Sequence, residues 1–185
     1  MNKKKNLTTE ETFALAIENH KKNNLQIAEN LYKEALKINP NHFESIYYLG
    51  TLLAQTKRFD LAKPLLHKAI QIQPNYVLTH NNLGNVLKEL GEYQKAIDYY
   101  KKAIQIDPNY LAPYNNLGKI LGELNYLDQA KKYYEKALNL NPNINETLDE
   151  YGKILLKLNK HTEGLNFIRK GTGFIRFEEK NFTLI

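Results

Sequence analysis

The stretch from His80 to Pro108, HNNLGNVLKELGEYQKAIDYYKKAIQIDP, decides the fold because its neighbours on both sides are copies of it. The copies are offset by 34 residues, the separation of Pro74 from Pro108. The recurring columns are Pro40, Pro74, Pro108 and Pro142; Leu15, Leu49, Leu83 and Leu117; Ala16, Gly50, Gly84, Gly118 and Gly152; Ala28, Ala62, Ala96 and Ala130; Ala35, Ala69, Ala103 and Ala137; and Tyr32, Leu66, Tyr100 and Tyr134. Repetition at this period predicts an array of supersecondary units.

Two helices are predicted in each copy. In the central copy the apolar residues fall at 83, 86, 87 and 90, and again between 96 and 106, at helical spacings of three and four. Each proline of the repeated column ends a helix, because proline disfavours the α conformation of the residue before it. A single helix pair cannot bury its apolar face, so stability must come from the stacking of neighbouring pairs.

The motif Leu83-Gly84-x-x-Leu87, followed by Ala96-x-x-x-Tyr100, Ala103 and Pro108, resembles the tetratricopeptide repeat, a helix-turn-helix unit. Four copies match in register and a fifth is degenerate. They lie at 9–42, 43–76, 77–110, 111–144 and 145–178, after an N-terminal tail at 1–8. The resemblance implies an all-α fold, a right-handed superhelical solenoid of antiparallel helix pairs whose concave side binds other proteins.

Composition excludes several classes of function. The chain has no cysteine, which excludes disulfides, thiol catalysis and cysteine-bound metals. No apolar run follows the basic residues 1–6, and no run of about 18 apolar residues occurs, so we expect neither a secretory signal nor a membrane span. We therefore expect a cytoplasmic protein. The net charge of +6 is compatible with binding of nucleic acid or an anionic surface, but lysine-rich solvated helix faces are the preferred interpretation.

Local features refine the helix boundaries. Thr8 with Glu11 predicts a capping box before a helix over 9–22, followed by a second helix over 25–38. If Asp60 caps the fourth helix, Pro64 lies one turn inside it and should distort it locally. Pro113, in the first turn of a helix, should be tolerated.

The fifth repeat departs from the others. Gly164 and Gly171 occupy the two alanine columns, so we expect a weakened helix over 161–170 that ends at Gly171-Thr172-Gly173. The apolar segment 172–185 is expected to be a C-terminal cap, with a docking strand or the start of a further unit as alternatives.

No active site is predicted. The five histidines never pair at metal-ligand spacing, and His80 is expected to pack rather than to bind metal. Phosphate-binding, nucleophile-elbow and zinc-protease motifs are missing from the sequence. We expect no catalytic residue, cofactor or metal, and no enzymatic activity.

The predicted binding groove is the face of each first helix opposite its core columns. It comprises Tyr47, Tyr48, Thr51, Asn81, Asn82, Asn85, Lys88, Asn115, Asn116, Lys119, Glu150 and Lys153. Asparagine carries a donor and an acceptor, so a row of asparagines can bind the backbone of an extended peptide. Asn82, Asn85 and Asn116 are similar to the asparagine ladder of O-linked N-acetylglucosamine transferases; the alternative is that they are ordinary exposed residues.

Two other binding modes fit the sequence less well. A carboxylate clamp, known in the resembling family, needs basic residues where this chain has Asn81, Glu146 and Glu150, so we reject it. The second helices carry a basic stripe on the convex side, interrupted by Glu34, Asp98 and Glu135. The stripe comprises Lys33, Lys68, Lys101, Lys102, Lys136, Arg169 and Lys170. Such a stripe could hold nucleic acid through phosphate contacts, but a solvated face is the preferred interpretation.

We therefore predict a non-catalytic interaction module or scaffold that binds an extended peptide or protein segment in its concave groove. The alternative is a substrate-recruiting array of a glycosyltransferase- or hydroxylase-type enzyme whose catalytic part lies elsewhere. The expected partner is a protein or peptide, without nucleic acid or membrane. The expected oligomeric state is a monomer or an end-to-end dimer.

Overall fold

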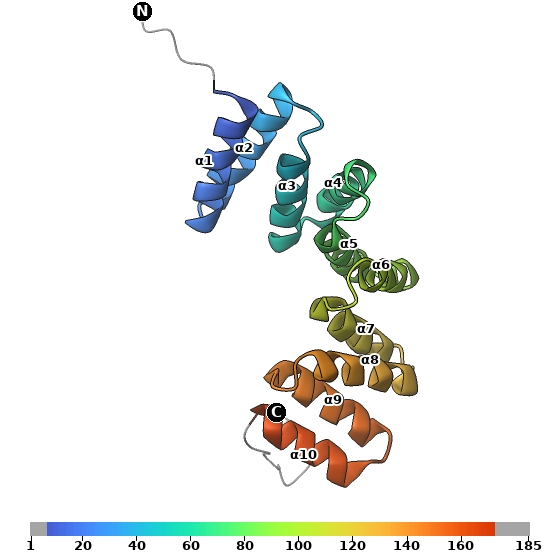
Figure 1. The fold of residues 1–185 in the computed structure, drawn as a ribbon. Helices are drawn as coiled ribbons and strands as arrows, with labels where there is room; N and C mark the ends of the chain where they lie inside the picture. Colours follow the sequence, from blue (N-terminus) through green and yellow to red (C-terminus); the bar gives the residue numbers. More distant parts are fainter. Residues whose placement is uncertain (1–6, 173–185) are drawn as a thin grey trace, which may run out of the picture. The chain divides into compact units, whose positions relative to one another are not determined.

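A computed structural model of the chain describes residues 7–172, and in this range the backbone forms ten α-helices and no strand (Figure 1). The helices are α1 (Thr9–Lys21), α2 (Leu25–Ile38), α3 (Phe43–Gln55), α4 (Phe59–Ile72), α5 (Val77–Glu89), α6 (Tyr93–Ile106), α7 (Leu111–Glu123), α8 (Leu127–Leu140), α9 (Asn145–Lys157) and α10 (His161–Thr172). None of these described helices is both long and apolar enough to cross a membrane.

The chain divides into two compact units, Met1–Tyr99 and Tyr100–Ile185, with the division inside α6. In the first unit α1 packs on α2, α3 on α4, and each pair contacts the next through α2 with α3 and α4 with α5. In the second unit the contacts run from α7 to α8, α8 to α9 and α9 to α10. Each helix therefore packs mainly against its neighbours in sequence, as stacked helix pairs must.

The repeated small and aromatic columns form the core. All eight alanines of the two alanine columns are fully buried. Tyr32, Leu66, Tyr100 and Tyr134 are also buried, at no more than 2% exposed. The glycine column makes room for the side chains of this tyrosine and leucine column, since a Cβ added at Gly118 would lie 2.7 Å from the Tyr134 ring. Periodicity in the sequence thus corresponds directly to periodicity in the core.

The turn inside each helix pair repeats with the same period. One residue per turn has a left-handed backbone: Asn23, Lys57, Gly91, Asn125 and Asn159, with φ between 58° and 74°. Asparagine and glycine adopt this conformation at little cost, which explains four of the five. The turns between pairs use the residue before proline: Asp107 accepts a hydrogen bond from the Asn109 backbone at 2.9 Å, and two of the other turns do the same with asparagine.

Several predicted boundaries are confirmed. The capping box forms, with Thr8 and Glu11 each accepting a hydrogen bond from the other's backbone N–H. Helix α2 has the predicted bounds and α1 ends one residue early. Pro113 lies in the first turn of α7.

Other expectations were partly wrong. Arg58, not Asp60, is the N-cap of α4, although α4 continues through Pro64 without a break, as expected. Helix α10 runs to Thr172, two residues beyond the predicted bound at 170 but within the segment Gly171-Thr172-Gly173 that was expected to end it. The predictions for the segment 173–185 lie outside the described residues.

Candidate functional site

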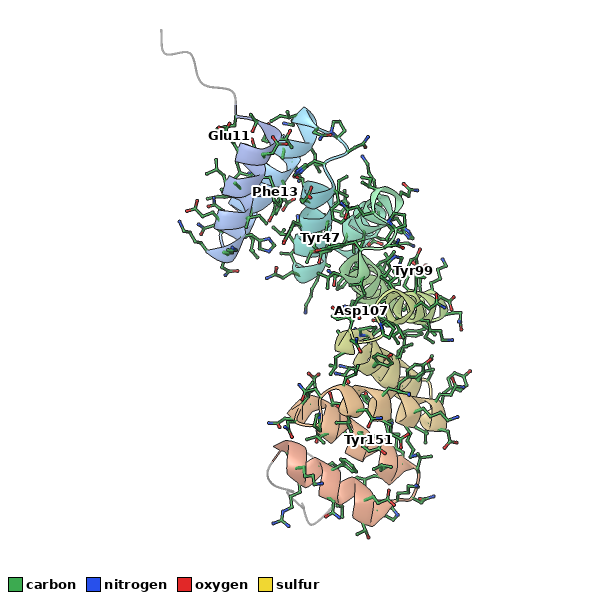
Figure 2. All side chains as sticks on the ribbon, in the orientation of Figure 1. Glu11, Phe13, Tyr47, Tyr99, Asp107 and Tyr151 are labelled. Carbon is green, nitrogen blue, oxygen red and sulfur yellow. The ribbon has the colours of Figure 1, made fainter. Side chains whose placement is uncertain are left out.

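The largest of the described cavities, about 570 Å³, lies between α1 and α3 in the first unit. It is lined by Phe13, Ile17, His20 and Lys21 of α1, by Phe43, Glu44, Tyr47 and Tyr48 of α3, and by Gln73 and Tyr76 before α5. We call it the aromatic pocket. Phe13 extends from α1 toward α3, and its ring centroid lies 5.7 Å from that of Tyr48 (Figure 2).

The aromatic rings hold one another in fixed orientations. Tyr76 meets Phe43 and Tyr47 edge to face, with centroids 5.0 Å and 5.1 Å apart and interplanar angles of 80° and 81°. Edge-to-face contacts of this kind add to the energy of apolar burial. These contacts set the orientation of three of the rings that line the pocket.

Neighbouring groups determine the state of two polar side chains at the pocket, Tyr47 and His20. Tyr47 is 7% exposed, and burial, assisted by Tyr76, raises its pKa to about 12, so it stays a neutral phenol. The Tyr32 hydroxyl donates to His20 Nδ1 at 3.1 Å, and His20 Nε2–H donates to Gln55 Oε1 at 3.1 Å. These bonds fix the imidazole at the pocket edge.

A second cavity of about 280 Å³ lies between α3 and α5 in the same unit. It is lined by Thr51, Ala54, Gln55, Phe59, Asn82, Asn85, Val86 and Glu89. Asn82 Nδ2 donates to the Tyr47 hydroxyl at 3.1 Å and to Thr51 Oγ1 at 3.3 Å. The bond between Tyr47 and Asn82 thus joins the two cavities. Both bonds use the Asn82 amide nitrogen, and the Asn82 carbonyl oxygen is the hydrogen-bond acceptor of the same side chain.

A third cavity of about 340 Å³ lies between α7 and α9 in the second unit. We call it the α7–α9 pocket. It is lined by Lys119, Gly122, Glu123, Tyr134, Glu150, Lys153, Ile154, Leu156 and Lys157. Lys153 Nζ lies 2.6 Å from Asp149 and 2.9 Å from Glu150, so its charge is compensated within α9.

The structure divides the predicted groove residues among several places. Tyr47, Thr51 and Asn82 come together from α3 and α5, and Lys119, Glu150 and Lys153 line one pocket. Tyr48 and Asn85 line the cavities of the first unit, and Lys88 lies 3.0 Å from its neighbour Glu89. Asn115 and Asn116 are half-buried.

Two asparagines differ from expectation. Asn81 is only 4% exposed, because its position on α5 turns it into the packed interior, so it does not face a groove. Asn115 Oδ1 accepts a hydrogen bond from Thr147 at 3.1 Å, which links α7 to α9. The predicted row of asparagines therefore serves partly to join neighbouring helices.

The sequence analysis missed the contribution of the first repeat. Phe13, Ile17 and His20 occupy the same groove columns in α1 that were listed only for later repeats. Carrying those columns back by 34 residues would have found them.

The structure also describes the surroundings of His80 and of two lysines of the basic stripe. His80 is 3% exposed and its Nε2–H donates to the Pro74 carbonyl at 2.7 Å, which confirms that it packs in the interior. Among residues 7–172, no three histidine or acidic side chains come together as a metal site would require. In the basic stripe, Lys33 pairs with Glu29 and Lys68 donates to the Pro40 carbonyl, each at 2.6 Å.

Three protein-family sequence models, each described as tetratricopeptide repeat, match residues 20–79, 77–110 and 111–144. Together they cover well over half of the chain. No curated protein matches the chain, so the similarity to O-linked N-acetylglucosamine transferases stays a prediction.

Solved structures share the fold at low identity. A MamA protein is 22% identical with a TM-score of 0.80, over 89% of this chain and 90% of its own. PilF of Pseudomonas aeruginosa is 23% identical with a TM-score of 0.78, over 88% and 76%. YrrB, described as a tetratricopeptide repeat protein with an unusual peptide-binding site, is 19% identical with a TM-score of 0.72, over 88% and 84%.

Proposed function

Because the chain belongs to the tetratricopeptide repeat family, we propose that it is a non-catalytic binding module that recognises an extended segment of a partner protein on α1, α3 and α5. The observation that carries this proposal is the aromatic pocket. A preformed cavity lined by aromatic side chains favours a bulky apolar side chain, which is the usual anchor of a peptide.

The neighbouring cavity supplies the polar part of recognition. Asn82 uses its two amide hydrogens within the protein, which leaves its carbonyl oxygen to accept from a peptide N–H. The Tyr47 hydroxyl holds Asn82 in place from the side of the aromatic pocket. An apolar anchor in one cavity and a backbone contact in the next would bind a segment that runs from α1 toward α5.

The structural neighbours support this kind of role. YrrB is described as having a peptide-binding site, and its fold is shared by this chain. The sequence of the chain also carries no catalytic motif. Both observations favour recognition over catalysis.

Affinity capture with matched variants tests the proposal. Ile17→Lys places a charge in the aromatic pocket, whereas Ile27→Lys makes the same change at a position on α2 that is already 51% exposed. The immobilised full chain and both variants, each confirmed helical by circular dichroism, are incubated with lysate and the retained proteins are identified.

We expect one partner to be retained by the wild type and by Ile27→Lys and lost by Ile17→Lys. A segment of that partner, titrated by calorimetry, should bind Ile17→Lys at least about tenfold more weakly, the loss typical of a disrupted anchor. Equal binding to all three proteins would show that the site is elsewhere.

A further inference from the structure

The rings of the aromatic pocket lie in two nearly perpendicular orientations. Tyr47 is nearly parallel to Phe43, with an interplanar angle of 11°. Tyr76 is nearly perpendicular to both, at 80° to Phe43 and 81° to Tyr47. Tyr48 is also nearly perpendicular to Tyr47, at 79° and with the ring centroids 5.1 Å apart. Rings arranged in this way offer both faces and edges to a compact apolar ring of a ligand.

This concentration of tyrosine is specific to one repeat. Tyr47 and Tyr48 occupy two adjacent columns of the second repeat, whereas the third and fourth repeats have asparagine pairs in the same columns, at 81–82 and 115–116. Among the described residues that line the α7–α9 pocket, only Tyr134 is aromatic. The aromatic pocket therefore differs in chemistry from the other candidate sites of the chain.

Two phenol hydroxyls of the pocket are available to a ligand. Tyr48 and Tyr76 are half-buried, and no described residue forms a hydrogen bond with either hydroxyl. Neither oxygen is enclosed in the interior, so both remain accessible. Burial, followed by the nearby Tyr48 and Glu44, raises the pKa of Tyr76, so this phenol keeps its proton. Both hydroxyls can therefore donate a hydrogen bond to a carbonyl oxygen of a ligand.

The charges of the pocket favour a neutral ligand. Its lining contains one carboxylate, Glu44 of α3, and one ammonium group, Lys21 of α1. His20 holds its neutral form between Tyr32 and Gln55, through a hydrogen bond at each ring nitrogen. The formal charges of the lining therefore cancel, and neither an acidic nor a basic segment is selected.

A segment in the polyproline II conformation has the features that this pocket can use. Such a segment has no internal hydrogen bonds, and proline has no N–H, so its backbone presents carbonyl oxygens that need donors. Its side chains are compact, neutral, apolar rings, which dock in aromatic-lined grooves. Its conformation is already fixed before binding, so little conformational entropy is lost.

We propose that the aromatic pocket binds a proline-rich segment of a partner protein in the polyproline II conformation. Proline rings of the segment pack on the rings of Phe43, Tyr47 and Tyr76, and the hydroxyls of Tyr48 and Tyr76 donate to its backbone carbonyls. This proposal rests on the proposed function of the chain as a peptide-binding module, and it specifies the class of segment that the first unit recognises.

Nuclear magnetic resonance on the full chain with capped octapeptide probes tests the proposal. One probe is a run of L-prolines, and its matched control is the same run of D-prolines, which has the same composition and the opposite helical hand. A third probe is a glycine–serine peptide with one central leucine. The Ile17 δ1-methyl signal reports on the aromatic pocket, and the Ile154 δ1-methyl signal reports on the α7–α9 pocket.

We expect the L-proline probe to shift the Ile17 signal saturably and to leave the Ile154 signal unchanged. The D-proline probe should bind at least about tenfold more weakly, because its carbonyls cannot reach the same donors. Equal binding of the two proline probes would overturn the proposal, and so would an L-proline probe that leaves the Ile17 signal unchanged.

Three variants assign the contacts. Tyr48→Phe and Tyr76→Phe each keep the ring and remove a hydroxyl that bonds no described residue, so the fold is retained. Each should weaken L-proline binding several-fold, and the double variant about tenfold. Tyr126→Phe makes the same change at a tyrosine outside the pocket that is 55% exposed, and should leave binding unchanged. Full affinity in the double variant would refute the role of the two hydroxyls.

The leucine probe and the capture experiment separate this proposal from the proposed function. A shift of the Ile17 signal by leucine but not by L-proline would refute a polyproline ligand and retain a pocket for an apolar anchor. Selective loss of a captured partner in Ile17→Lys would likewise leave the proposed function standing if the L-proline probe does not bind.

Discussion

Gly164→Ala distinguishes a weakened helix from a closely packed one. Gly164 lies in α10, in a column that is alanine in the four earlier repeats. Helix propensity alone predicts that alanine would stabilise α10 by about 1 kcal/mol. The structure predicts the opposite sign, because the new Cβ would lie 2.8 Å from the backbone oxygen of Gly152 in α9 and 2.8 Å from a methyl of Leu156.

The magnitude follows from which atoms can move. The Leu156 side chain can change rotamer, but the Gly152 oxygen belongs to the backbone of α9, so the two helices must separate. Overpacking of this kind costs about 1–3 kcal/mol. After the propensity gain is subtracted, we expect a net loss of about 1–2 kcal/mol in the free energy of unfolding of the last repeat.

Urea unfolding followed by circular dichroism, with hydrogen exchange of the α10 amides, measures this loss. Asn166→Ala is the matched control, because it raises the helix propensity of α10 at an exposed position. We expect this control to be neutral or stabilising by about 0.5 kcal/mol. If Gly164→Ala is as stable as the control, the close packing of α9 and α10 does not need glycine, and the sequence interpretation of a decayed repeat is right.

Two further predictions concern contacts between helices in the first unit. Tyr32→Phe should lower the free energy of unfolding by about 1 kcal/mol in urea titrations, because it loses the bond to His20, whereas the same change at Tyr134 should cost much less. Glu29→Gln should cost about 1–2 kcal/mol at neutral pH, since Glu29 is paired at 2.7 Å with Arg58, which is 38% exposed. That hydrogen bond lowers the Glu29 pKa below 4.5, so the advantage of the wild type should be present above pH 4.5 and disappear as the pH falls through the lowered value. Convergence of the two unfolding curves only at alkaline pH would contradict this assignment.

The helices were predictable because their signals are local and repeated. The bounds of α2 and the capping box of α1 follow from residues within one turn of each helix end. The four prolines of the repeated column fix the period of 34 residues, so a helix boundary that is uncertain in one repeat can be set from the equivalent position in the next. Local details were harder to predict: the N-cap of α4 is Arg58 and not Asp60, although α4 continues through Pro64 as expected, since tertiary packing holds a helix whose own propensity is poor.

The candidate site was only partly predictable, because its chemistry depends on distances between repeats. Columns place Asn82 and Asn115 on one face of their helices, but they do not show that Asn82 reaches Tyr47 or that Asn115 accepts from Thr147. The same limitation affected Gly164, whose cost was judged from its own helix without the backbone of α9 beside it.

The surroundings of the core-column side chain differ between repeats, because the column twelve positions before it changes. The core column has a tyrosine in the first, third and fourth repeats and a leucine, Leu66, in the second. In the first repeat the residue twelve positions earlier is His20, which is hydrogen-bonded to the Tyr32 hydroxyl. In the fourth repeat it is Gly122, which has no side chain and lines the same pocket as Tyr134. A Cβ added at Gly122 would meet the terminal methyl of Ile154 at 2.7 Å, an atom that a change of rotamer can move, so Gly122→His would test whether this column sets the surroundings of the Tyr134 hydroxyl.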